Sequence, residues 1–220
     1  MDFQDFPKMA RLSRDMIVSE KIDGTNAQVC ITTLIEDAWP DRIGIPYVTK
    51  INGQMIQAGS RTRWITPADD NHGFAAWVRA HAEELLTLGD GRHFGEWWGS
   101  GIQRGYGLKE KRFSLFNATR WAAHDQPLLS IQSQDPRALP KWQERPPVCC
   151  SVVPVLIQGP FCTEAIRHTL DLLRERGSYA APGFMKPEGV VVFHTAGNVG
   201  FKKTLDKDAM PKSLAKLQPA

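Results

Sequence analysis

Residues 17–34 read IVSEKIDGTNAQVCITTL, and this stretch decides how the rest of the chain is interpreted. Its β-branched and alternating residues predict strands over 17–22 and 26–34, with a tight Asp-Gly turn between them. Lys21 then lies at a strand end just before a glycine turn, where an amine is firmly held and still accessible. Taken alone the pattern is weak, because an exposed lysine in a hairpin would look the same.

The remaining chain is also rich in strands. Further strands are predicted at residues 46–51, 54–59, 92–98, 112–116, 148–157, 188–194 and 199–205, the first two flanking an Asn-Gly hairpin signal. Residues 71–88 and 163–176 predict helices, and residues 134–147, with four prolines, predict a long loop or subdomain joint. Short turns between many strands favour an α+β fold with antiparallel β-sheets and flanking helices over alternating βαβ units.

Composition excludes several classes of protein. With 220 residues, 42% hydrophobic and 23% charged, the chain is not disordered throughout. No apolar run approaches the roughly 20 residues that span a bilayer, and the acidic N-terminus is no secretory signal. The four cysteines include no C-x-x-C pair, which indicates reduced thiols and a cytoplasmic protein. A net charge of +3 is compatible with a polyanionic partner without indicating one.

Two motifs in the first half bear polar groups that suit a nucleotide. Arg61 and Arg63 would share one face of a strand, where guanidinium groups suit phosphate or sugar contacts. Glu96 interrupts an aromatic strand, and a carboxylate there needs a partner unless the strand is an exposed edge. For the arginines the ordinary alternative is a solvated strand edge.

Three further positions follow along the chain. Phe113 could stack on a base, although core packing is the commoner fate of such a residue. Glu188 begins a buried-type strand, where its oxygen could hold a hard metal ion, or it could be a solvated turn carboxylate. Lys202 and Lys203 would point to opposite faces of a strand, so that only one can enter a given site.

In this order the segments resemble the covalent nucleotidyltransferase superfamily of polynucleotide ligases and capping enzymes, over about residues 19–204. Residues 21–26, 94–96 and 188–191 are most similar to motifs of phage-type, nick-sealing RNA ligases. The resemblance implies the nucleotidyltransferase fold of those ligases, with residues 1–220 as one catalytic domain. Residues 205–220 would be a short tail, with no additional C-terminal domain.

The resemblance also implies catalytic and metal-binding roles. Lys21 would be the nucleophile that takes AMP from ATP, Glu188 would hold Mg²⁺ or Mn²⁺, and Lys202 would grip the α-phosphate. The last motif of the family usually has two lysines separated by one residue. Thr204 takes the second place here, and Lys186 is a candidate substitute.

The remaining implied roles concern binding of the nucleotide and the nucleic acid. The resemblance places Glu20 beside adenine, Phe113 stacked on adenine and Glu96 on a ribose hydroxyl. Ile22, Asn26 and Arg61 would complete the site, with Asn26 near the 5′-phosphate end and Arg61 at the ribose or a nucleic-acid phosphate.

The expected activity is ATP-dependent joining of RNA 3′-OH and 5′-phosphate ends, through lysyl-AMP and an adenylylated 5′ end. The partner would be RNA, including nicked duplex, and a homodimer or accessory protein could help to hold it. Three alternatives stay open: a DNA nick ligase, a GTP-using guanylyltransferase of the capping type, and a non-catalytic RNA-binding module.

Overall fold

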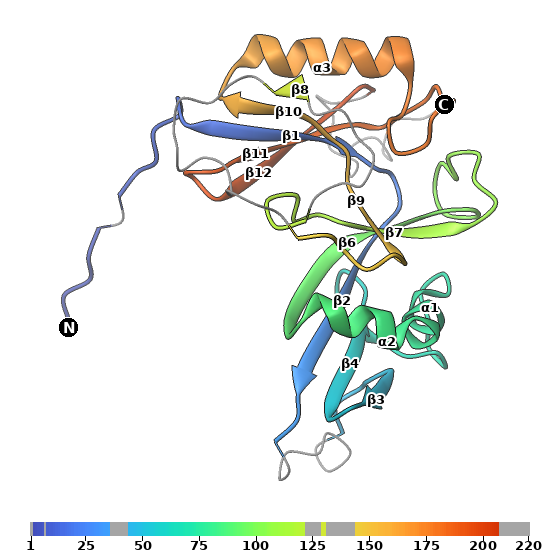
Figure 1. The fold of residues 1–220 in the computed structure, drawn as a ribbon. Helices are drawn as coiled ribbons and strands as arrows, with labels where there is room; N and C mark the ends of the chain where they lie inside the picture. Colours follow the sequence, from blue (N-terminus) through green and yellow to red (C-terminus); the bar gives the residue numbers. More distant parts are fainter. Residues whose placement is uncertain (1, 7, 36–43, 122–128, 131–143, 207–220) are drawn as a thin grey trace, which may run out of the picture. The chain divides into compact units, whose positions relative to one another are not determined.

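The computed structural model describes residues 2–6, 8–35, 44–121, 129–130 and 144–206. The chain divides into two compact units, each containing one β-sheet. Unit 1 comprises Met1–Lys21, Gln126–Leu139 and Pro154–Ala220, and unit 2 comprises Ile22–Asp125 and Pro140–Val153. The predicted α+β class is confirmed, because both sheets are mainly antiparallel and helices accompany them (Figure 1). No helix in these described residues is long and apolar enough to cross a membrane.

Unit 1 is a five-stranded sheet with a helix along one face (Figure 1). Its strands, in order across the sheet, are β12 (Val199–Thr204), β11 (Gly189–His194), β1 (Asp15–Lys21), β10 (Val155–Pro160) and β8 (Leu129–Ser130). Among the described strands of this sheet, β8 and β10 pair in parallel and the others pair antiparallel. The covering helix α3 spans Thr163–Arg176, as the sequence predicts.

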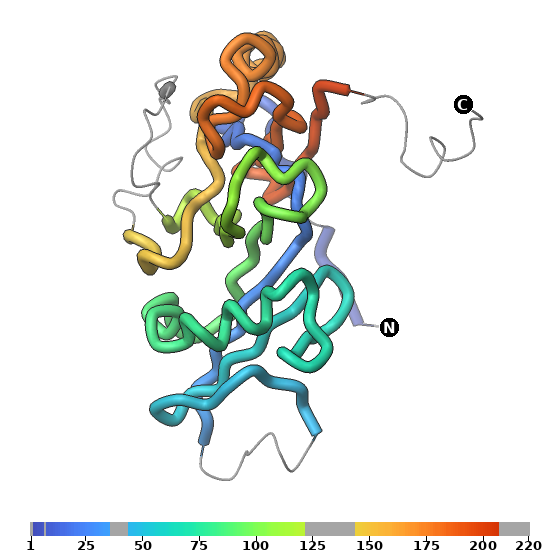
Figure 2. The backbone as a smooth tube through the Cα atoms, turned by 90° about the vertical axis from the view of Figure 1, so that its right-hand side faces the viewer, coloured from blue at the N-terminus to red at the C-terminus, as the bar shows by residue number. Residues whose placement is uncertain are grey.

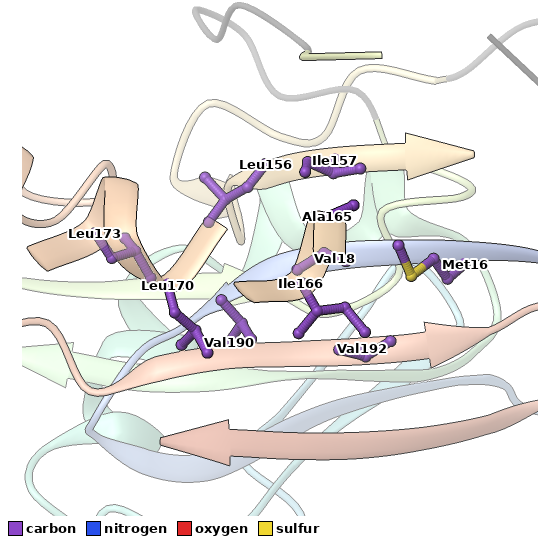
Figure 3. Close-up of a cluster of buried hydrophobic side chains, with 10 residues drawn as sticks. All are labelled: Met16, Val18, Leu156, Ile157, Ala165, Ile166, Leu170, Leu173, Val190 and Val192. Carbon is purple, nitrogen blue, oxygen red and sulfur yellow. The ribbon is translucent and has the colours of Figure 1, made fainter. Parts of the chain in front are cut away.

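The core of unit 1 lies between α3 and this sheet (Figure 3). Met16 and Val18 of β1 are fully buried, and in Figure 3 they face the same side as Val190 and Val192 of β11. The opposing apolar side chains come from α3 and include Ala165, Ile166, Leu170 and Leu173. Because side chains alternate along a strand, Lys21 belongs to the other face of β1.

Unit 2 is built on a seven-stranded sheet. Its path runs β3 (Thr49–Ile51), β4 (Gln54–Gly59), β2 (Thr25–Thr33), β6 (Gly91–Gly99), β7 (Lys111–Leu115) and β9 (Cys150–Val152), and β5 (Trp64–Ile65) pairs with β4. The predicted hairpin between β3 and β4 is confirmed. Its turn residues Asn52 and Gly53 have φ values of 50° and 74°, as a tight two-residue hairpin turn requires.

The helix predicted over residues 71–88 is shorter and broken. It forms α1 (Phe74–Ala80), α2 (Ala82–Leu85) and the 3₁₀ turn η2 (Leu86–Leu88). Gly73 has a φ of 79° and His81 a φ of −111°, both outside the helical region, so the helix starts late and is interrupted.

One predicted strand, residues 148–157, is wrong. It is two strands, β9 and β10, which lie in different sheets. Pro154 stands between them, and a proline has no N–H to donate to a ladder. Strands β1 and β2 also lie in different sheets, so the Asp-Gly turn between them is not a hairpin. Of the predicted loop 134–147, residues 134–143 lie outside the described residues.

Candidate functional site

Lys21 is the last residue of β1, at the strand end that the sequence predicts. Its Nζ donates a hydrogen bond to Glu188 Oε2 at 2.5 Å, and the two side chains are 23% and 5% exposed. Strand β1 is held on both sides, by β10 and β11, and Lys21 stands opposite Gly189. The amine therefore projects from a fixed backbone and is paired with a nearly buried carboxylate.

Gly189 brings a third strand close to this pair. A Cβ at this position would lie 2.2 Å from the carbonyl oxygen of Lys203 and 2.7 Å from the Cα of Thr204, which excludes any other residue without movement. Its φ of 153° also favours glycine. The close approach of β12 places Thr204 opposite Gly189, which in turn stands opposite Lys21.

The register of β12 separates its two lysines. Lys202 pairs with Val191, whereas Lys203 pairs with Val190. Val190 belongs to the core beneath α3, so Lys203 is on the α3 face of the sheet and Lys202 is on the face of Lys21. The prediction that only one of these lysines can serve a site at Lys21 agrees with this register.

Glu20 is buried, and its carboxylate binds residues 178–180 of unit 1. Its carboxylate accepts hydrogen bonds from the Ser178 hydroxyl at 2.6 Å and from the N–H groups of Tyr179 and Ala180 at 2.8 and 2.9 Å. Burial raises the pKa of Glu20, although these hydrogen bonds act in the opposite direction. In this structure Glu20 fixes the chain between α3 and Glu188. Its expected place beside adenine stays a prediction.

Glu96 organises the turn that follows Lys21 in the sequence. It stands opposite Asn26 in the β2–β6 pair and is 7% exposed, so the edge-strand alternative is wrong. Its Oε1 accepts the N–H of Gly24 at 3.0 Å, and its Oε2 accepts Nδ2 of Asn26 at 3.2 Å. A Cβ on Gly24 would lie 2.5 Å from the carbonyl oxygen of Trp97, so this turn needs glycine to approach β6. The preceding Ile22 is buried.

Asp23 has two further partners, which the sequence does not predict. Nε of Arg104 donates to its carboxylate at 2.9 Å, and its own N–H donates to the hydroxyl oxygen of Tyr106 at 2.8 Å. Both partners lie more than 80 residues away, so no local pattern reveals the pairing. The available signal was the density of glycines around them, at positions 99, 101, 105 and 107.

Two residues are placed differently from the sequence prediction. Arg61 is exposed in a bend between β4 and β5, not on a strand, and Arg63 beside it pairs with Asp69. Phe113 is completely buried, with ring centroids 5.1 Å from Phe74 and 5.8 Å from Trp77. Because the core encloses this ring, its expected stacking on adenine is corrected to core packing.

The predicted residues thus fall into two groups. Unit 1 contains Glu20, Lys21, Glu188 and Lys202, and unit 2 contains Ile22, Asn26, Arg61, Glu96 and Phe113. Within unit 1, Lys21 is bonded to Glu188 and shares its sheet face with Lys202, whereas Glu20 lies on the α3 face. An amine bonded to a carboxylate, with a second cation on the same sheet face, suits attack on a phosphate and stabilisation of its charge. In the described part of the chain no three His, Cys, Asp or Glu side chains gather as metal ligands.

Comparisons with known proteins point to one family. The sequence profile described as RNA ligase matches residues 14–207. No curated protein matches the chain. A ligand-free lysine-to-alanine variant of Naegleria gruberi RNA ligase matches in structure with a TM-score of 0.50 and 18% identity, over 87% of this chain and 50% of that one.

A second solved structure gives a similar result. It is an arginine-to-alanine variant of Naegleria gruberi RNA ligase with ATP and Mn, matched with a TM-score of 0.49 and 17% identity, over 89% of this chain and 51% of that one. The present chain therefore spans about half the length of the solved chains that it matches. At this identity the first structure supports the fold alone.

Proposed function

The chain belongs to the RNA ligase family, and from this premise we propose that it joins RNA ends with ATP through a lysyl-AMP intermediate. The observation that carries the proposal is the pairing of Lys21 with Glu188 at the end of β1. The amine of Lys21 is partly accessible, and its carboxylate partner is nearly buried. Lys21 also begins residues 21–26, the stretch that resembles the nucleophile motif of the family.

The reaction has three balanced steps. Nζ of Lys21 attacks the α-phosphorus of ATP, so that an N–P bond forms, pyrophosphate leaves and the amine gives up its proton. The AMP then passes to an RNA 5′-phosphate, which restores the free lysine. Finally an RNA 3′-hydroxyl attacks that phosphate, a phosphodiester bond forms, and AMP leaves.

Glu188 and Lys202 have different tasks in these steps. Glu188 Oε2, 2.5 Å from Nζ, is within reach to hold the proton that the amine must lose. Lys202 lies on the same sheet face as Lys21, from where a cation stabilises charge that develops on the α-phosphate. Lys186 remains a candidate for the second cation of the last motif.

Mg²⁺, or Mn²⁺ in its place, is part of the proposal. Mg²⁺ is usually held by one or two carboxylates together with substrate phosphates, and Glu188 offers one such carboxylate. When bound, the ion neutralises charge on the phosphates. Because Lys21 already occupies Oε2 of Glu188, a cation there would compete with the lysine for this carboxylate.

Residues of unit 2 complete the proposed binding of nucleotide and RNA. Arg61, exposed in its bend, is available to a phosphate or a ribose. Asn26 and Glu96 stay assigned to the 5′-phosphate end and a ribose hydroxyl, and Ile22 to the nucleotide site. The single-domain organisation, the cytoplasmic location and a homodimer or accessory protein stay predictions from the sequence.

Parallel assays on matched substrates test this function. The protein is incubated with ATP or GTP and with duplexes that differ only in carrying an RNA or a DNA nick. We expect sealing of the RNA nick with ATP. Sealing confined to the DNA nick, or an adduct formed only with GTP, would favour the other nucleotidyltransferases. RNA affinity that falls with salt, without any nucleotide adduct, would indicate a binding module.

A further inference from the structure

The loop between β6 and β7 has an unusual backbone, and Figure 2 traces it in green. Five of its residues have positive φ values between 46° and 73°, namely Gly101, Gln103, Gly105, Tyr106 and Gly107. Glycine adopts such values freely, but Gln103 and Tyr106 do so at a cost. Strained backbone of this kind persists where its surroundings fix it, and it gathers at functional sites.

The strained loop makes two different contacts with one residue, Asp23. The hydroxyl oxygen of Tyr106 accepts the N–H of Asp23 at 2.8 Å, which restrains the backbone. Nε of Arg104 lies 2.9 Å from Asp23 Oδ2, and this ion pair restrains the side chain. The side chains of Arg104 and Asp23 are 28% and 18% exposed, so water screens the pair less than it screens a surface ion pair.

Tyr106 is itself held firmly. It is buried, and its ring meets that of Trp98 edge to face with centroids 5.0 Å apart. Trp98 is fixed in turn, because its Nε1 donates to the Ser114 hydroxyl at 2.8 Å. The acceptor offered to Asp23 is therefore rigidly placed.

Asp23 follows Lys21 by two residues, so the contacts of Arg104 and Tyr106 with Asp23 restrain the chain close to the nucleophile. Pairing with β10 and β11 fixes the chain that enters Lys21. Arg104 and Tyr106 fix the chain soon after it leaves. An amine that must approach a phosphorus atom gains from restraint on both sides, because small misplacements cost large factors in rate.

We infer that Arg104 and Tyr106 are positioning residues, which act through Asp23 to hold the backbone beside the nucleophile Lys21. The inference rests on the proposed function, since it concerns formation of lysyl-AMP. Neither residue is assigned a contact with ATP or RNA. Their loss should therefore slow the covalent step and leave the ATP concentration for half-maximal rate nearly unchanged.

The test uses two variants with matched controls. Tyr106→Phe removes only the hydroxyl, and Arg104→Met removes the charge but keeps most of the length. Tyr47→Phe removes a tyrosine hydroxyl elsewhere, and Arg174→Met removes the exposed pair between Arg174 and Asp171. Single-turnover formation of lysyl-AMP is followed over a range of ATP concentrations. Urea unfolding of each variant gives the fraction of folded protein.

We expect the maximal rate per folded molecule to fall about tenfold in Tyr106→Phe and in Arg104→Met, as for the loss of one good hydrogen bond. Asp23→Asn combined with Arg104→Met should lose less than the product of the two single effects, because both changes break one interaction. Both controls should keep the wild-type rate.

The possible failures can be told apart. If the wild-type protein forms no adduct, the proposed function is wrong and this inference falls with it. If the wild type forms the adduct and both loop variants match its rate per folded molecule, the positioning role is wrong and the proposed function stands. A rate loss fully accounted for by unfolded protein also overturns the positioning role.

Discussion

The two units of the molecule use their buried glutamates differently. In unit 1, Glu188 faces a charged amine, Nζ of Lys21, at 2.5 Å. In unit 2, Glu96 faces neutral donors, the N–H of Gly24 and the side-chain amide of Asn26. A carboxylate within hydrogen-bond reach of an amine can accept its proton, whereas a carboxylate that accepts only amide N–H groups fixes the conformation of the chain. We propose that Glu188 acts in the chemistry, and that Glu96, besides its proposed contact with a ribose hydroxyl, fixes the turn after Lys21.

The largest expected difference tests this contrast directly. Glu188→Gln keeps the size of the side chain but removes its charge, and we expect lysyl-AMP formation to fall by about 100-fold or more, as for loss of an acid–base group. Glu96→Gln places an amide donor against existing donors. We expect it to lower the free energy of unfolding by about 1–2 kcal/mol, with a smaller loss of rate.

Single-turnover labelling with α-labelled ATP and urea unfolding measure the two effects. The contrast would be wrong if Glu188→Gln kept normal, metal-dependent labelling, or if Glu96→Gln were the more inactive variant at unchanged stability.

Two neighbouring lysines of unit 1 differ in the same way. Lys202 and Lys203 are neighbours on β12 but belong to opposite faces of the sheet. We expect Lys202→Ala to slow lysyl-AMP formation by about 100-fold, as for the loss of a group that stabilises developing charge. Lys203→Ala is the matched control, expected to stay within about threefold of the wild type. Equal losses in the two variants, measured in the same labelling assay, would reject the assignment of faces.

The smallest expected effect concerns Glu20 and pH. Burial raises the pKa of Glu20 in the folded state, so the folded protein binds this proton more tightly than the unfolded chain does. The stabilisation that comes from this raised pKa is therefore fully present below the pKa of Glu20 in the unfolded chain, about 4.3. It is lost as the pH rises through the pKa of Glu20 in the folded protein. Glu20→Gln removes this titration.

Urea unfolding over a pH series checks this prediction. The free energy of unfolding of the wild type, minus that of Glu20→Gln, should fall as pH rises through this range. A difference that rises over the same range would mean that the hydrogen bonds from the 178–180 segment outweigh burial.

Much of the fold could be predicted from the sequence, because its patterns are local. Helix α3 matches its predicted span, and the Asn-Gly signal correctly marks the β3–β4 hairpin. Lys21 lies at its predicted strand end. Where local patterns compete with tertiary structure, the sequence misleads. Continuous apolar character hides the change of sheet at Pro154, and helical periodicity hides the interruption at His81.

The sequence predicts which residues form the candidate site better than it predicts what those residues contact. The role of a buried carboxylate depends on partners that sequence does not reveal, such as Ser178 for Glu20, 158 residues away. Phe113 fits a stacking role by type, but its neighbours in unit 2 enclose it. Asp23 belongs to a recognisable motif, whereas its partners Arg104 and Tyr106 required the structure.

The central claim is that Lys21 carries AMP covalently. Intact-protein mass spectrometry after incubation with ATP and Mg²⁺ tests it most directly, with Lys21→Ala as the variant and Lys203→Ala as a folded control. The account predicts a gain of one AMP on the wild-type protein and on Lys203→Ala, and no gain on Lys21→Ala. A full AMP adduct on Lys21→Ala, or none on the folded wild-type protein, would contradict it.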